Sequence, residues 1–355
     1  MSMLVNTTFR TVVRRTCRSS RPIISCQRIL PAATTNETMM IQRRHASSTS
    51  SETTSSSSRS LSVASEEVTK FSSMAGTWWD SRQNPLVGMN PIRVQYMVEL
   101  LGQQRQQQQQ HHPKKTNATG SQNTTNESIM TASSELSPLQ GLRALDVGCG
   151  GGLLSESLAR LGASVTSVDP SIDVARAAME HSRHDKRTST IDYRGGISVE
   201  DLAHEIMSLQ NDSDNNNNNA LLFDVVCILE VIEHATDPHS LIEAAASLLK
   251  RPTDEDPGGI LFVSTINRTA KSFAIAIVGA EHVTRMVPVG THSWDTFRSP
   301  QEVQVIVEAA SSSPGLVQVD VCGMVIKPPF LDMSWRLDPN DTDVNWIGAY
   351  QHKKV

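Results

Sequence analysis

The chain has 355 residues, of which 38% are hydrophobic and 19% are charged, so it can bury a core of one or two domains. Its formal net charge of −5 is unevenly distributed: residues 1–60 hold nine arginines, no lysine and two acidic residues, a balance of +7 that leaves −12 for the rest. An acidic main domain is repelled by phosphate backbones, which argues against a nucleic-acid partner.

Residues 1–60 have the composition of a targeting segment. They are rich in arginine and serine and poor in acidic residues, which is typical of an organelle transit peptide. No apolar run in them is long enough for a secretory signal or a membrane span. We predict that they form a disordered mitochondrial transit peptide; the alternative is a disordered basic tail without a targeting role.

A helical segment is expected over residues 61–101 and the core of the protein over residues 139–355. The low-complexity insert between them, residues 102–138, contains a glutamine run followed by serine, threonine and asparagine. A second polar insert, residues 210–219, ends in five asparagines. Neither insert can bury enough apolar surface to become ordered, so both are predicted to be exposed loops away from any site.

In the core, short apolar runs alternate with helical patterns. The predicted strands are Arg143–Val147, Ser164–Val168, Thr190–Arg194, Phe223–Leu229 and Ile260–Thr265. The helices predicted between them are Leu153–Leu161, Ile172–His184, Val199–Ser208 and His239–Leu249. This order predicts an α/β fold with a parallel sheet covered by helices on both faces and a ligand beyond the carboxyl ends of the strands. Val317–Val325 and Val344–His352 are expected to pair in antiparallel fashion at one sheet edge.

The turn after the first strand indicates a nucleoside site. It reads LDVGCGGGLL, and glycines such as Gly148 and Gly150 let the backbone approach a ligand. Asp169 ends the next strand, where a carboxylate can accept hydrogen bonds from both ribose hydroxyls. A dinucleotide is disfavoured because Leu153 stands where its third glycine is required. The turn resembles instead the first motif of class I S-adenosylmethionine (SAM)-dependent methyltransferases.

A second candidate for chemistry is LEVIEH, at the end of the fourth predicted strand. If the chain turns helical there, Glu230, Glu233 and His234 share one face. Two carboxylates and an imidazole can act as a general base or hold a divalent ion, with Mg²⁺ or Mn²⁺ suited better than zinc. Alternatively, these residues only cap a loop or orient a substrate.

Several longer motifs resemble the ubiquinone-biosynthesis O-methyltransferase family. They are Trp78-Trp79-Asp80, Asn90-Pro91-Ile92-Arg93, LDVGCGGG, EVIEH, STINR, VGAEHVTRMVPVGTH and the terminal VNWIGAYQHK. The resemblance implies a Rossmann-like class I methyltransferase fold, with a mostly parallel seven-stranded sheet and a reversed edge strand. It also implies that Arg93 contacts the SAM carboxylate, that Gly148 and Asp169 hold its backbone and ribose, and that Leu229 lies near adenine. Glu230, Glu233 and His234 match positions associated with Mg²⁺.

The same resemblance implies the reaction and its setting. The family methylates ring hydroxyls of a polyprenyl dihydroxybenzoate and of demethylubiquinol, so a polyprenylated phenol is the expected substrate. We also expect membership of a multi-subunit biosynthetic complex. Two alternatives stay open: methylation of another small phenol or of a carbon, and a non-catalytic scaffold that keeps SAM for stability.

The segment Ala270–Met286 contains an apolar run, Phe273–Ala280, that is too short to span a bilayer. One interpretation is a lid that covers the substrate and dips into a membrane interface, and the other is an ordinary core helix. A polyprenylated substrate favours the lid. We therefore predict peripheral association with the matrix side of the mitochondrial inner membrane.

Overall fold

The computed structural model describes residues 62–82, 84–111, 137–211, 218–283, 289–311, 315–327 and 334–353. The predicted transit peptide, residues 1–60, lies outside the described residues. So does most of the insert at 102–138 and the middle of the motif VGAEHVTRMVPVGTH, residues 284–288.

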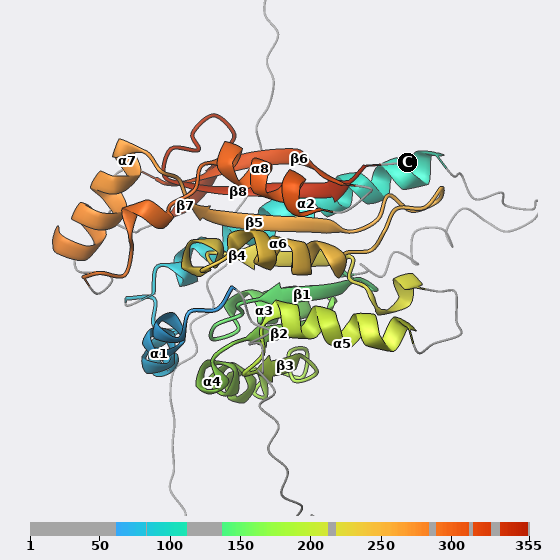
Figure 1. Ribbon diagram of the computed structural model, residues 1–355, viewed down its shortest axis with the longest axis horizontal. Helices are drawn as coiled ribbons and strands as arrows, with labels where there is room; N and C mark the ends of the chain where they lie inside the picture. The colour runs from blue at the N-terminus through green and yellow to red at the C-terminus, as the bar shows by residue number, and fades with distance from the viewer. Residues whose placement is uncertain are drawn as a thin grey trace, which may run out of the picture. The chain divides into compact units, whose positions relative to one another are not determined.

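One eight-stranded sheet forms the centre of the described core, in the order β3-β2-β1-β4-β5-β8-β6-β7 (Figure 1). Its strands are β1 (Arg143–Val147), β2 (Ser164–Asp169), β3 (Asp192–Gly195), β4 (Val225–Leu229), β5 (Ile260–Ile266), β6 (Leu316–Ile326), β7 (Trp335–Asp338) and β8 (Asn345–His352). The first five strands pair in parallel, β8 is antiparallel to β5 and β6, and β7 is antiparallel to β6. The predicted mostly parallel sheet with a reversed edge region is confirmed.

The strand count differs from the seven expected. The additional strand is β7, which has four residues and pairs with the end of β6.

Helices cover both faces of the sheet, as predicted. The main helices are α1 (Ser65–Ser73), α2 (Leu86–His111), α3 (Leu153–Arg160), α4 (Ile172–Ser182), α5 (Val199–Asn211), α6 (Pro238–Ser247) and α8 (Pro300–Ala310). Buried residues of α5, α6 and α8 share one apolar cluster with the sheet, whereas those of α2, α3 and α4 share another on the opposite face. Burying each such Val, Leu or Ile contributes roughly 1.5–3 kcal/mol.

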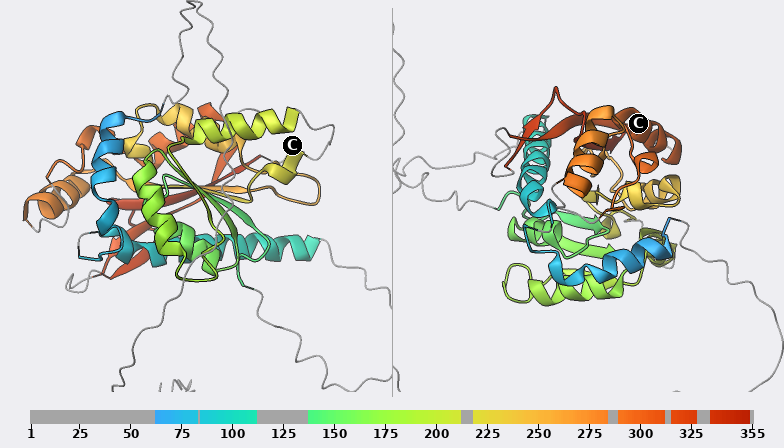
Figure 2. Two further views of the ribbon diagram at one scale, coloured as in Figure 1. Left: turned by 90° about the horizontal axis from the view of Figure 1, so that it is seen from below. Right: turned by 90° about the vertical axis from the view of Figure 1, so that its left-hand side faces the viewer.

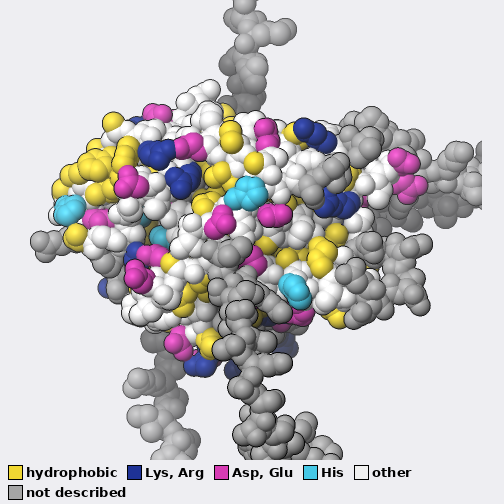
Figure 3. Space-filling model, in the orientation of Figure 1, with side chains coloured by type: hydrophobic (Ala, Val, Ile, Leu, Met, Phe, Trp, Pro, Cys, Tyr) yellow, Lys and Arg dark blue, Asp and Glu magenta, His cyan; other side chains and the backbone are white. Residues whose placement is uncertain are grey.

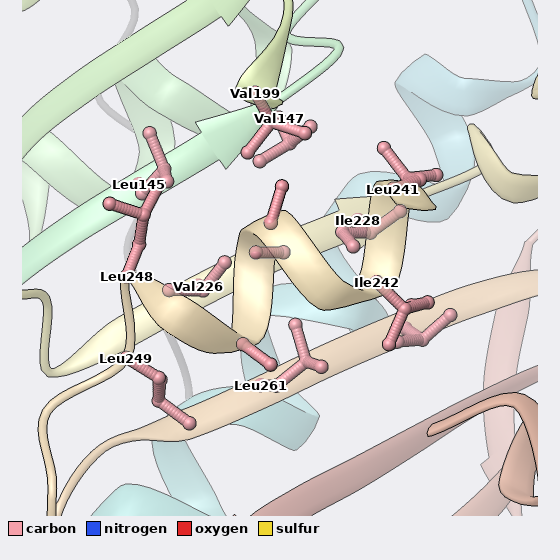
Figure 4. Close-up of a cluster of buried hydrophobic side chains, with 14 of the residues drawn as sticks. Leu145, Val147, Val199, Val226, Ile228, Leu241, Ile242, Leu248, Leu249 and Leu261 are labelled. Carbon is pink, nitrogen blue, oxygen red and sulfur yellow. The ribbon is translucent and has the colours of Figure 1, made fainter. Parts of the chain in front are cut away.

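Figure 4 shows the first of these clusters, in which α6 lies on the central strands. Leu241 and Ile242 of α6 face Ile228 of β4 and Leu261 of β5, and all four are nearly or fully buried. Asp237 is the N-cap of α6. Its Oδ1 accepts hydrogen bonds from the backbone N–H groups of His239 and Ser240. This N-cap sets where α6 starts and therefore which residues reach the core.

The expectation of a loop over residues 102–138 is wrong at its beginning, because α2 continues through the glutamine run to His111. Glutamine is a good helix former, and this end of α2 has partners in the core. Gln104 Nε2 donates to the carbonyl oxygen of Gly258 at 3.1 Å, and Arg105 Nη1 donates to that of Pro138 at 2.7 Å. The second insert likewise starts inside α5 and ends in the 3₁₀ turn η2 (Asn218–Leu221).

The carboxyl ends of the parallel strands point to one end of the molecule, where α1 and the π-helical segment η4 (Phe273–Val283) also lie (Figures 1 and 2). The short helix α7 (Ala270–Ser272) leads into η4. Among the described residues, no helix combines the length and apolar character needed to cross a bilayer.

Candidate active site

The glycine turn between β1 and α3 adopts a conformation that requires glycine. Gly148 and Gly150 have φ angles of 67° and 53°, which side-chain-bearing residues rarely adopt. A Cβ atom on Gly148 would lie 2.6 Å from Val231 Cγ2, and one on Gly150 would lie 2.7 Å from Trp78 Cη2. The glycines therefore let the side chains of Val231 and Trp78 pack directly on the backbone of the turn, and the predicted nucleoside site stays a prediction.

Asp169 links this turn to the start of α4. Its Oδ2 accepts a hydrogen bond from the backbone N–H of Gly150 at 2.9 Å, and its Oδ1 accepts one from that of Ser171 at 2.8 Å. Burial raises the pKa of Asp169, and the two backbone donors oppose that rise. Each carboxylate oxygen has a second lone pair that can accept a further hydrogen bond.

A pocket lies over the glycine turn. It is bounded by α1, the ends of β1, β2 and β4, and the loop before α5. Its lining includes five of the residues predicted from the sequence: Gly148, Gly150, Asp169, Glu230 and His234. Arg93, Leu229 and Glu233 do not line it. Leu229 is buried at the end of β4, beside Ser264 of β5.

Trp78 and Trp79 pack against the glycine turn, a role that sequence reasoning missed, and we call this pair the tryptophan clasp. Trp79 Nε1 donates a hydrogen bond to the carbonyl oxygen of Gly151 at 2.9 Å. The Trp79 ring stacks on His181 of α4, with 3.8 Å between ring centroids. Trp78 lines the pocket beside Gly150. The unusual Trp-Trp pair was the available signal, but its partners lie more than seventy residues away in the chain.

Glu230 follows β4 in a strained conformation. Its φ angle is 59°, and it is the non-glycine residue with positive φ among those the structure describes. Its backbone N–H donates to the carbonyl oxygen of Ser264 at 3.0 Å, and Ser264 Oγ donates to Glu230 Oε1 at 2.7 Å. Burial raises the pKa of Glu230, whereas the positive charge of Arg93 opposes the rise.

Arg93 is a buried cation with an incomplete set of partners. Arg93 is only 3% exposed, and its Nη2 donates a hydrogen bond to Asn90 Oδ1 at 3.1 Å. Its Nε finds no hydrogen-bond partner in the part of the chain that the structure describes. Burial lowers the pKa of Arg93, and the carboxylates of Glu230 and Asp146 oppose this effect. A buried donor without a partner fits a site for an anionic ligand group.

Glu233 points away from the pocket into the sheet. Thr265 Oγ1 donates a hydrogen bond to its Oε2 at 2.8 Å, and the residue is 6% exposed. Burial, together with the nearby negative charge of Glu230, raises the pKa of Glu233 to about 8. At neutral pH this carboxyl group is therefore mostly protonated.

His234 faces the pocket and pairs with a residue from α1. Its Nδ1 lies 2.9 Å from Glu67 Oε2, and its ring meets that of Phe71 edge-on at 4.9 Å. Burial lowers the pKa of His234 to about 4, although Glu67 opposes that shift. The imidazole is therefore neutral at physiological pH and can accept a proton.

The expected single face of Glu230, Glu233 and His234 does not form. The chain makes only the one-turn 3₁₀ helix η3 (Ile232–His234), and the three side chains have separate partners on β5 and α1. Within the described residues, no group of three or more His, Cys, Asp or Glu side chains is arranged to hold a metal ion. The predicted three-ligand magnesium site is thus not built by these side chains.

A second carboxylate–imidazole pair joins Glu281 of η4 to His292. Glu281 is 1% exposed, and its carboxylate accepts hydrogen bonds from the backbone N–H groups of Gly290 at 2.7 Å and His292 at 2.8 Å. His292 Nδ1 lies 2.9 Å from the same carboxylate. Glu281 and His292, which belong to the same long motif, are therefore in direct contact.

Comparison with known proteins places the chain in a family. A family model described as a methyltransferase domain matches residues 121–310. A ubiquinone biosynthesis O-methyltransferase from Cereibacter sphaeroides is 39% identical over 288 residues, covering 80% of this chain and 94% of the relative. The protein of the same name from Xanthomonas axonopodis pv. citri is 37% identical over 300 residues, covering 83% and 97%. The chain belongs to the ubiquinone biosynthesis O-methyltransferase family.

Membership of this O-methyltransferase family agrees with the fold and makes the chain a methyltransferase. Among solved structures, magnesium protoporphyrin IX methyltransferase from Synechocystis PCC 6803 with bound SAH has 18% sequence identity and a TM-score of 0.39, covering 61% of this chain and 76% of that one. This similarity is distant, and the assignment rests on the relatives in sequence.

Proposed function

We propose that the protein is a SAM-dependent O-methyltransferase of ubiquinone biosynthesis that methylates ring hydroxyls of polyprenyl dihydroxybenzoate and demethylubiquinol intermediates. The relatives named for this pathway support the substrate class. The observation that carries the reaction is one pocket lined both by the glycine turn with Asp169 and by the half-buried imidazole of His234. A donor cradle and a proton acceptor thus face the same space.

The donor half of the pocket fits SAM. SAM supplies an electrophilic methyl group on its sulfonium sulfur. Asp169 retains lone pairs for the ribose hydroxyls, and Gly148 and Gly150 line the pocket, so their backbone can meet the chain between ribose and amino acid. Arg93 does not line this pocket, but its buried Nε has no hydrogen-bond partner among the described residues, which suits a ligand carboxylate.

The acceptor half of the pocket can activate a phenol. A phenol has a pKa near ~10, so little phenolate exists at neutral pH and a base is required. His234 lines the pocket, and its imidazole is unprotonated. We assign His234 as the group that receives the hydroxyl proton. Glu233 contacts β5 through the hydrogen bond that it accepts from Thr265.

The direct test is an assay of the purified protein with SAM and a catechol that carries a short isoprenoid tail. The proposal expects an O-methylated catechol and stoichiometric S-adenosylhomocysteine. Methylation of an untailed phenol or of a ring carbon in its place would favour the alternative substrates. SAM binding without any product would favour a scaffold. The same assay with a chelator and Mg²⁺ add-back tests the magnesium requirement, which remains a prediction from the family resemblance.

We also propose peripheral attachment to the matrix side of the mitochondrial inner membrane. Apolar side chains gather over the end of the molecule formed by α7 and η4 (Figure 3). They include Phe273, Ile275 and Val278, which are 42%, 44% and 43% exposed. Exposed apolar surface at the same end of the molecule as the carboxyl ends of the parallel strands supports docking on a bilayer.

Liposome flotation tests this attachment. Ile275→Glu with Val278→Glu should abolish flotation, because two charges then face the lipid. The matched control is Val305→Glu with Val319→Glu, which alters exposed valines on α8 and β6, at 66% and 47% exposure. Equal flotation of both variants would contradict the proposal. Import of a reporter fused behind residues 1–60 into mitochondria tests the targeting assignment in the same way.

A further inference from the structure

Trp78 contributes an aromatic ring to the donor half of the pocket. It follows the 3₁₀ turn η1 (Ala75–Thr77) and lines the pocket together with Gly148 and Gly150. Its Nε1 is buried and has no hydrogen-bond partner among the residues that the structure describes. The part of the indole that reaches the pocket is therefore the ring. The face of a tryptophan ring carries partial negative charge and attracts cations.

The ring lies against the glycine turn. A Cβ atom on Gly150 would lie 2.7, 2.8 and 3.0 Å from the ring atoms Cη2, Cζ3 and Cζ2 of Trp78. These three atoms are neighbours in the six-membered ring, so that Cβ position lies over the ring and not beyond its edge. A Cβ atom on Gly151 would lie 2.7 Å from Trp78 Cγ. The indole thus extends along both glycines and borders any ligand chain that follows the turn.

The two groups proposed to anchor SAM lie on either side of this contact. Asp169, proposed for the ribose, accepts a hydrogen bond from the backbone N–H of Gly150 at 2.9 Å. Just after the turn, Asn90 Nδ2 donates to the carbonyl oxygen of Leu153 at 3.0 Å, and Asn90 Oδ1 accepts from Arg93 Nη2 at 3.1 Å. In SAM the sulfonium sulfur lies between the ribose and the amino acid. A donor held at both anchors therefore carries its positive charge past the indole.

The indole is held in place by the protein itself. Asn84, which is buried, donates a hydrogen bond from Nδ2 to the backbone carbonyl oxygen of Trp78 at 2.8 Å. The next residue, Trp79, is bonded through Nε1 to the carbonyl oxygen of Gly151. The ring of Phe71 from α1 lies beside that of Trp78, with 6.3 Å between centroids. A side chain fixed in this way loses little freedom when a ligand binds, so little of its attraction is offset by ordering.

We propose that Trp78 recognises the positive charge of the donor through a cation–π contact with the sulfonium group. This inference rests on the proposed function, because it requires SAM in the pocket. During the reaction the substrate oxygen forms a bond to the methyl carbon and loses its proton, while the electron pair of the broken carbon–sulfur bond stays on sulfur. The sulfur thereby becomes a neutral thioether. The contact with Trp78 then favours SAM over the product S-adenosylhomocysteine.

The test compares ligands that differ in charge at one position. SAM carries a sulfonium group there, sinefungin an ammonium group and S-adenosylhomocysteine a neutral thioether. Calorimetric titration of the full chain gives their dissociation constants in the wild-type protein and in Trp78→Leu. We expect the dissociation constants of SAM and sinefungin to rise by roughly 2- to 30-fold more than that of S-adenosylhomocysteine. An equal loss for all three ligands, as stacking on adenine would give, would overturn the proposal.

Trp79→Phe is the matched control. Trp79 packs on the same turn, but it does not line the pocket. Loss of its hydrogen bond to Gly151 should weaken all three ligands by the same factor, so that the preference for SAM over S-adenosylhomocysteine stays at its wild-type value. A wild-type protein that binds SAM but forms no methylated product would refute the proposed function alone, because the charge preference is measured without turnover.

Fluorinated tryptophans at position 78 give a second test that preserves the shape of the side chain. One, two or three fluorine atoms on the six-membered ring withdraw electron density from its faces and so weaken its attraction for a cation. The affinity for SAM should fall with each added fluorine, whereas that for S-adenosylhomocysteine should stay constant. A SAM affinity that does not depend on the number of fluorine atoms would overturn the proposal, even if Trp78→Leu does not fold.

Discussion

The two halves of the pocket are built in different ways. The donor half is centred on two paired parallel strands, β1 with the glycine turn after it and the end of β2, and much of this centre is backbone, to which Trp78 and Trp79 add contacts from a distant segment. The acceptor half joins side chains from distant segments: Glu67 from α1 and His234 from the turn after β4. Substitutions in the donor half should therefore weaken the binding of SAM, and substitutions in the acceptor half should lower kcat.

The largest effect is expected in the acceptor half. His234→Ala removes the proposed base, and general-base catalysis contributes roughly 10²–10⁴-fold in rate. The variant should lose about that factor in kcat and keep its dissociation constant for SAM. Rapid-quench kinetics and calorimetry measure the two quantities. A variant that loses SAM affinity and keeps kcat would show that the two halves are not separate.

In the donor half, Asp169→Ala should weaken SAM binding by about 10²–10³-fold, because two hydrogen bonds to a charged acceptor are lost. The change also leaves the backbone N–H groups of Gly150 and Ser171 without their acceptor. Asp173→Ala is the control, since that side chain is 64% exposed in the first turn of α4. Calorimetric titration with SAM should show an intact affinity for the control alone.

The pH dependence of kcat distinguishes His234 from Glu233 as the base. Burial lowers the pKa of His234 to about 4, so the unprotonated imidazole is lost only as the pH falls through that value. We expect kcat to stay level down to about pH 5 and to fall about tenfold per unit well below 4. With Glu233 as the base, the pKa of about 8 would make kcat decline already below pH 8.

A smaller effect is expected from the tryptophan clasp. Trp79→Phe keeps an aromatic ring on His181 but removes the hydrogen bond from Nε1 to Gly151. Such a bond contributes about 0.5–1.5 kcal/mol, which corresponds to a roughly 2- to 12-fold weaker affinity for SAM. The KM for SAM should rise and kcat should stay constant. A change in kcat alone would contradict a role confined to the donor half.

The smallest effect is expected for Glu233→Gln. Because Glu233 is mostly protonated at neutral pH and accepts a hydrogen bond from Thr265, the isosteric amide should replace it with less than a ~3-fold change in kcat. Steady-state kinetics at pH 7 checks this. A loss as large as that of His234→Ala would place Glu233 among the catalytic groups after all.

The same contrast explains what could be predicted from the sequence. The strands and the donor residues, from Gly148 to Asp169, follow from local patterns, because periodicity and glycine conformations are local properties. The joint face of Glu230, Glu233 and His234 was a wrong prediction, because it assumed a regular helix where Glu230 adopts a positive φ. The helical glutamine run and the partner of His234 also required tertiary contacts that no local pattern encodes.

The contacts made ahead of α2 determine how far the chain can be shortened. The methyltransferase domain match begins at residue 121, after α1, Trp78 and Arg93. A truncation at that boundary would keep the glycine turn but delete its tryptophan clasp and the carboxylate beside His234. The first described residue, Ser62, accepts a hydrogen bond at its carbonyl oxygen from the backbone N–H of Thr236, in the turn after β4. Any trimmed version made for expression therefore has to begin at or before Ser62.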